Sequence, residues 1–173
     1  MEGGLRLNVW RPLELLPVFA PAGGIVPLQE LGQDINDCGN PQALEILVFP
    51  GADGHFTLRE DDGRYPGVTC EQRSGEVRTE IVYDDALGTL TIHPADGCTD
   101  ALPALRSWTV TMRGVEKPTQ VSVNGESTEF AYDPDTLSVC VTIHEAEVSQ
   151  VLEVSFAGRK RPVFAENPVE NDI

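Results

Sequence analysis

The chain has 173 residues, enough for one or two domains with a hydrophobic core. It is too short for a barrel of eight βα units, which needs about 250 residues. Acidic residues outnumber Lys and Arg by 28 to 12, which gives a net charge of −16. Proteins that bind nucleic acid need a basic face, so this charge argues against a nucleic-acid partner. No apolar run approaches the roughly 20 residues that cross a bilayer, so we expect no membrane partner either.

The cysteines are spread widely along the chain, as Cys38, Cys70, Cys98 and Cys140. They form no Cys-x-x-Cys pair and have no histidine nearby, so their spacing is not that of a metal site. The first residues carry no signal-peptide pattern. We therefore expect reduced thiols and a cytoplasmic protein.

The predicted elements begin after an N-terminal region of different texture. Residues 13–28 are apolar and rich in Pro and Gly, and residues 33–41 are polar and turn-prone, which indicates a domain boundary near residue 40. Beyond it, apolar alternation and β-branched runs predict strands rather than helices. The predicted strands are Leu44–Phe49, Phe56–Glu60, Glu76–Tyr83, Thr89–His93, Ser107–Met112, Thr119–Val123, Thr136–Ile143 and Val151–Phe156.

Turn signals between these runs favour antiparallel pairing. Asn124-Gly125 predicts a hairpin between residues 120–123 and 126–132, because both residues tolerate a positive φ. Residues 50–54 and 133–135 predict further turns. In the strand that ends at Ile143, the alternation places Cys140 on the face opposite to the apolar side chains. Together these features predict an all-β fold, an antiparallel β-sandwich.

Three adjacent acids, Glu60, Asp61 and Asp62, follow the predicted strand that begins at Phe56. Neighbouring strand residues point to opposite faces, so Glu60 and Asp61 would not converge on one substrate. We favour a turn in which the aspartates bind local backbone amides before Gly63. A structural cation such as calcium is the alternative, although the spacing is not that of an EF-hand loop. A small hydrolase that uses Glu60 and Asp62 is the third hypothesis, and we assign no catalytic, cofactor-binding or metal-binding residue.

Other side chains that could take part in binding or catalysis have simpler structural interpretations. Trp108 alternates with Val110 and Met112, which favours burial. Isolated histidines lack metal-site spacing, serines lack a nucleophile-elbow context, and the basic triplet 159–161 fits a solvated tail. The aromatic residues considered for a sugar platform are Trp10, Tyr65, Tyr83 and Trp108; the histidines are His55, His93 and His144; and the serines are Ser74 and Ser107.

Three blocks of the sequence resemble glycoside hydrolase family 31. Residues 17–28, PVFAPAGGIVPL, resemble the family's segment "PVFxxAGxIxPL" after the catalytic barrel. Residues 40–65, which include Asn40-Pro41 and GHFTLREDDG at 54–63, resemble its "NP..L.L.vyPG.dG.FtLYEDDG.s..Y" run. Arg59 stands where an aromatic residue is commoner. Residues 118–125 resemble its "P..V.vNG" hairpin, so the resemblance covers roughly residues 3–156.

The resemblance implies a position outside the catalytic centre. Family 31 enzymes are retaining and carry their two catalytic carboxylates on the barrel, and no barrel motif is recognisable here. Two β-sandwich domains, proximal and distal, follow the barrel. The resemblance implies that residues 1–40 are a remnant of the proximal one and residues 41–158 are the distal one, with residues 159–173 as a disordered tail. The chain would then be a truncated C-terminal portion of the enzyme.

The resemblance therefore implies a non-catalytic portion of an α-glucosidase or α-xylosidase. Its partner would be the catalytic barrel, which it would stabilise through an exposed apolar face. Candidates for that face are Val18, Phe19, Ile25 and Val26. An independent carbohydrate-binding module is the alternative. We also expect self-association, because a sandwich without its first strands exposes an unpaired edge.

Overall fold

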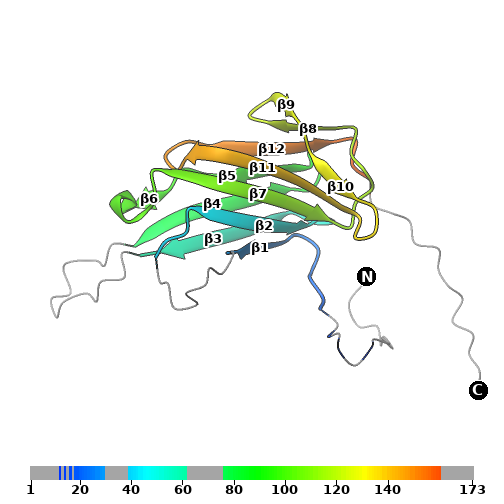
Figure 1. Ribbon diagram of the computed structural model, residues 1–173, viewed down its shortest axis with the longest axis horizontal. Coiled ribbons are helices and arrows are strands. Elements are labelled where there is room, and N and C mark those ends of the chain that lie inside the picture. The colour runs from blue at the N-terminus through cyan, green and yellow to red at the C-terminus, as the bar shows by residue number, and fades with distance from the viewer. Residues whose placement is uncertain are drawn as a thin grey trace, which may run out of the picture.

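The computed structural model describes residues 12, 14, 16, 18–29, 39–61 and 76–160. These residues form two sheets packed face to face, a β-sandwich, with one short 3₁₀ turn at Thr99–Ala101 (Figure 1). The predicted all-β sandwich is confirmed. Among the described residues, no helix is long and apolar enough to cross a membrane.

The first sheet has five strands in the order β1-β2-β7-β11-β10. All of its neighbours are antiparallel except β2 and β7, which run parallel. Parallel neighbours need a long crossover, and here the chain passes through the second sheet between them. The strands are β1 (Gly24–Leu28), β2 (Ala43–Phe49), β7 (Leu105–Arg113), β10 (Ala131–Asp133) and β11 (Ser138–Glu147).

The second sheet has seven strands, six of them in the order β3-β4-β5-β12-β8-β9, with short β6 paired to β4. All of its pairs are antiparallel. The last strand of the described residues, β12, lies between β5 and β8, which come earlier in the chain. The strands are β3 (Gly54–Glu60), β4 (Val77–Asp84), β5 (Thr89–Ile92), β6 (Asp96–Gly97), β8 (Gln120–Val123), β9 (Glu126–Thr128) and β12 (Leu152–Ala157).

The core lies between the two sheets and follows directly from the alternation of side chains along the strands. Every second residue of β2, β4, β7 and β12 is buried, and all but one of the buried apolar side chains on these strands belong to one cluster. Fully buried members include Ile46, Val48, Ile81, Val110, Met112, Val154 and Phe156. Trp108 belongs to this cluster, so its predicted burial is confirmed.

All eight predicted strands are present, with ends that differ by a few residues. The Asn124-Gly125 hairpin is confirmed, with φ of 48° and 84° at its two residues. The predicted strand over 126–132 is wrong in one respect. It divides at Glu129-Phe130 into β9 and β10, which pair in different sheets.

The strand β1 was not predicted, because its residues are mixed with Pro and Gly. It pairs with β2 in the five-stranded sheet, so the boundary predicted near residue 40 falls between two paired strands. Ile25 is only 7% exposed and joins the core, so its predicted place on an exposed apolar face is wrong. Val18 and Phe19 are 89% and 66% exposed, and Val26 is partly exposed.

The two sheets meet along one edge at Gly23 and Gly54. A Cβ atom added to Gly54 would fall on the Gly23 carbonyl oxygen, and a Cβ added to Gly23 would fall on the Asp53 carbonyl oxygen. The backbone of β3 therefore passes the lead-in to β1 at a distance that only glycine permits. β1 and β3 both begin at this contact, and both run along the edge of the sandwich toward its other end.

We predict that Gly54→Ala lowers the free energy of unfolding by about 2 kcal/mol, because the added methyl group forces two backbones apart. Gly114→Ala is the matched control: it has a φ of 73° with open space around the Cβ position, so it costs only the backbone strain of about 1 kcal/mol. Urea unfolding measures both. Equal losses in the two variants would show that the close approach has no energetic weight.

Candidate functional site

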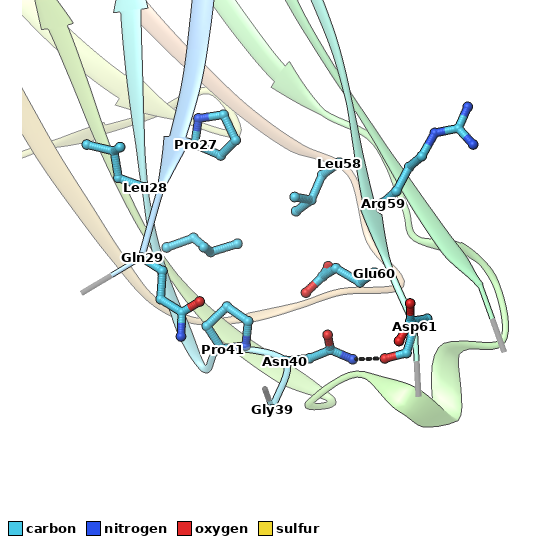
Figure 2. Close-up of a pocket in the computed structure, with 11 residues that line it drawn as sticks. Pro27, Leu28, Gln29, Gly39, Asn40, Pro41, Leu58, Arg59, Glu60 and Asp61 are labelled. Atoms are coloured by element: carbon cyan, nitrogen blue, oxygen red, sulfur yellow. Dashed lines mark hydrogen bonds between the residues drawn. The ribbon is translucent and has the colours of Figure 1, made fainter. Parts of the chain in front are cut away.

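A pocket of about 390 Å³ lies where the ends of β1 and β3 face each other (Figure 2). Pro27, Leu44 and Leu58 give it apolar walls, and the amides of Gln29 and Asn40 lie at its rim. In Figure 2, Leu58 and Glu60 of β3 point toward the pocket, whereas Arg59 points away from it. This is the alternation expected of a strand at the edge of a sheet.

The carboxylate of Glu60 is held by a bidentate ion pair with Arg106. The guanidinium donates from Nη1 to Oε2 at 2.9 Å and from Nη2 to Oε1 at 2.7 Å. The two side chains are 7% and 0% exposed, respectively. Arg106 also donates from Nε to the carbonyl oxygen of Pro41 at 3.0 Å, and it lies 5.5 Å from the centre of the Trp108 ring. Each charge therefore has specific partners in place of water.

This ion pair joins the two layers of the sandwich. Glu60 ends β3 in the seven-stranded sheet, and Arg106 lies on the core-facing side of β7 in the five-stranded sheet. Asn40 strengthens the same end of the molecule, because its Nδ2 donates to the carbonyl oxygens of Asp61 and Ala101, both at 2.8 Å. The pocket is thus bounded by a rigid set of polar contacts between segments far apart in sequence.

The structure changes the interpretation of the three acids. Glu60 does not close a turn, as the sequence suggested; its side chain points inward and pairs with Arg106. Asp61 is exposed, and its backbone carbonyl accepts from Asn40. Asp62 lies outside the described residues. Within the described ranges, no group of three or more His, Cys, Asp or Glu side chains is placed to hold a metal ion.

A second polar cluster occupies the turn after β4. Oδ1 of Asp85 accepts from the backbone amide of Gly51 at 2.9 Å and from the hydroxyl of Tyr83 at 3.1 Å. Arg159 approaches the same carboxylate at 3.3 Å, donates to the carbonyl oxygen of Asp85, and lies 5.7 Å from the centre of the Tyr83 ring. Arg159 is therefore mostly buried, so its predicted place in a solvated tail is wrong.

Tyr83 is fully buried in this cluster. Burial raises the pKa of its phenol well above the usual value of 10.0, and the nearby carboxylate of Asp85 raises the pKa further, while Arg159 lowers it. Removing the phenolic proton would place a second negative charge beside Asp85 in the core. The cluster therefore stabilises the neutral form of the Tyr83 phenol over its charged form.

The remaining side chains singled out in the sequence do not gather into a site. Tyr83 and Trp108 are buried, so neither can offer a ring face to a sugar. His55 forms an exposed contact with Glu80, and His93 and His144 are exposed. Ser107 is partly exposed on β7. The residues that lie outside the described ranges are Trp10, Cys38, Tyr65, Cys70, Ser74 and Arg161.

Arg106 is the residue that the sequence interpretation missed. The predicted strand begins one residue later, at Ser107, and leaves Arg106 outside it. The signal was present, because Arg106 alternates with Trp108, Val110 and Met112 and so falls on the core-facing side of the strand. An arginine in that position needs an acidic partner from another element.

Comparisons with known proteins link this sandwich to one family of enzymes. No family model matches the chain. An α-xylosidase from Saccharolobus solfataricus is 29% identical over 135 residues, which cover 74% of this chain and 18% of that enzyme. A family 31 dextranase from Flavobacterium johnsoniae, solved in complex with glucose, has a TM-score of 0.63 at 16% identity, over 78% of this chain and 19% of that one. A family 31 α-xylosidase from Xanthomonas citri has a TM-score of 0.48 at 24% identity, over 76% of this chain and 12% of that one.

The matches to the α-xylosidase from Saccharolobus solfataricus and to the dextranase confirm the resemblance to glycoside hydrolase family 31. The chain is similar to a β-rich part of these enzymes, and it spans only about a fifth of their length. The α-xylosidase sequence supports the family, and the dextranase structure supports the fold. The relatives are hydrolases of glycosidic bonds, and the matched region is a small portion of each.

We predict that Arg106→Met lowers the free energy of unfolding by about 3 to 5 kcal/mol, because it leaves the Glu60 carboxylate buried without a counter-charge. The double variant Glu60→Met with Arg106→Met should recover a large part of that loss, since both charges are then gone. Arg78→Met, which breaks an exposed pair with Glu76, should leave unfolding almost unchanged. A double variant no more stable than Arg106→Met, in urea unfolding, would contradict the prediction.

We predict that Tyr83 makes the protein less stable in alkali. Its pKa is higher in the folded state than in the unfolded chain, so its contribution is present below pH 10 and is lost as pH rises further. The free energy of unfolding should fall by up to about 1.4 kcal/mol per pH unit in that range. Tyr83→Phe should lose this component, and an identical pH dependence in the two proteins would contradict the assignment.

Proposed function

We propose that the chain is a non-catalytic β-sandwich portion of a family 31 glycoside hydrolase, which packs on the catalytic barrel and stabilises it. The parent activity that we propose is hydrolysis of α-glycosidic bonds, as in an α-glucosidase or α-xylosidase. The similarity to family 31 enzymes supports the family, and the small share of their length that is matched supports an accessory position.

The observation that carries the proposal is that the Glu60 carboxylate is buried and paired with Arg106. A retaining glycosidase holds two carboxyl groups about 5 Å apart in a cleft that admits a sugar. Glu60 lines a pocket, but both of its oxygens accept hydrogen bonds from Arg106, and its side chain is 7% exposed. Its contacts serve the packing of the two sheets, which is the role expected of a structural carboxylate rather than a nucleophile.

The surface that we propose for the barrel is the segment that leads into β1. Leu16, Val18 and Phe19 expose most of their side chains, at 86%, 89% and 66%. Three large apolar residues so close in sequence and so exposed are unusual for a surface that faces only water. Packing against a neighbouring domain would remove this area from solvent and stabilise both parts.

We predict that the isolated chain hydrolyses p-nitrophenyl α-glucoside and p-nitrophenyl α-xyloside no faster than the buffer blank. Asp61→Asn serves as the diagnostic variant, because Asp61 is exposed and its replacement leaves the core intact. The variant and the parent chain should give the same rate. Hydrolysis above the blank that is lost in Asp61→Asn, with unfolding unchanged, would overturn the proposed non-catalytic function.

A further inference from the structure

The chain beyond β12 is bound on both sides. On one side, the backbone amide of Glu116 donates to the carbonyl oxygen of Lys160 at 2.8 Å. On the other side, the amide of Phe156 donates to the carbonyl oxygen of Gly88, in the turn between β4 and β5, at 3.0 Å. The end of β12 and residues 158–160 therefore join the segment before β8 to the turn before β5.

The side chain of Arg159 crosses this turn to reach Asp85. A Cβ atom added to Gly88 would lie 2.4 Å from Nε of Arg159, so a larger residue there would displace the arginine. The same aspartate accepts from the backbone amide of Gly51, and its own amide donates to Oδ1 of Asp53, both at 2.9 Å. Arg159 thus holds the β4–β5 turn, and that turn holds the loop between β2 and β3.

Arg106 and Arg159 are both largely buried, but they differ in how well their nitrogen atoms are satisfied. Arg106 is 0% exposed, and its Nε, Nη1 and Nη2 atoms all donate hydrogen bonds. Arg159 is 13% exposed, and its Nε is buried without a hydrogen-bond partner among the described residues. A buried donor without a partner costs free energy that is recovered when water reaches it. The contact of Arg159 is therefore released more readily than that of Arg106.

We propose that the contact of Arg159 with Asp85 is a latch, whose release frees the end of β12 while the rest of the sandwich stays folded. Proteins open locally where the contacts are fewest, and this end of β12 is the last of the described strands to be fixed. The ion pair of Glu60 lies about 20 Å away, at the far end of β3, so it does not depend on the latch. The latch does not rest on the proposed function.

The latch uses three properties of the guanidinium group. Arg159 pairs with the Asp85 carboxylate at 3.3 Å and donates to the carbonyl oxygen of the same residue. Its Cζ atom also lies 5.7 Å from the centre of the Tyr83 ring. A lysine would keep the charge but lose the planar group that serves all three contacts. The latch therefore requires an arginine, and a positive charge alone does not close it.

Hydrogen exchange of single backbone amides, measured by NMR on the full chain, tests the latch. Arg159→Met should speed exchange at the amides of Phe156 and Glu116 at least about tenfold, because both donate hydrogen bonds beside the latch. Arg159→Lys should resemble Arg159→Met. The amides that pair β7 with β11 should exchange as they do in the parent chain, since the five-stranded sheet stays closed.

Lys160→Met is the matched control, because Lys160 is the next residue and is exposed, and it should leave exchange unchanged. Asp85→Asn removes the counter-charge, so adding it to Arg159→Met should speed exchange less than it does alone. Equal acceleration of all amides in Arg159→Met, or loss of its fold, would overturn the proposal, because Arg159 would then hold the whole sandwich. So would unchanged exchange at Phe156 and Glu116, an equal effect of Lys160→Met, or full additivity with Asp85→Asn.

Discussion

The buried pair between Glu60 and Arg106 is the contact on which the arrangement of the sandwich depends. Hydrophobic packing draws the two sheets together but does not fix how one lies over the other. A bidentate ion pair has a single good geometry, and both partners here are excluded from water. Any sliding of one sheet past the other would break it and leave two buried charges without partners. Such a pair adds specificity even where it adds little net stability.

The same pair explains why the three adjacent acids predicted the direction of the Glu60 side chain but not its structural role. Three adjacent acids resembled a set of catalytic carboxylates, and the alternation of β3 correctly placed Glu60 and Asp61 on opposite faces. What the sequence could not supply was the partner, which lies 46 positions away. The identity of that partner depends on which strands face each other across the core. Local pattern fixes the direction of a side chain and not what it meets.

The strands themselves were largely predictable, and the exceptions have physical causes. β2, β4 and β12 alternate clearly because one side of each strand is buried and the other faces outward. β1 lacked this signal, since Gly24 and Pro27 are two of its five residues and only its pairing with β2 makes it a strand. The parallel pairing of β2 with β7 also escaped prediction. It depends on the path through the second sheet rather than on any short segment. For the pocket, the acids were visible in the sequence but the role of Arg106 required the fold.

The position of β12 has a consequence for how the chain becomes a folded protein. This strand, close to the end of the described residues, lies between β5 and β8 at the middle of its sheet. β5 and β8 are synthesised before β12. Each keeps one edge unpaired until residues 152–157 pair with both of them. During synthesis the sheet is therefore divided, with open edges on both sides of a gap. Folding cannot be completed strand by strand from the N-terminus. The second layer closes only when residues 152–157 take their place between β5 and β8.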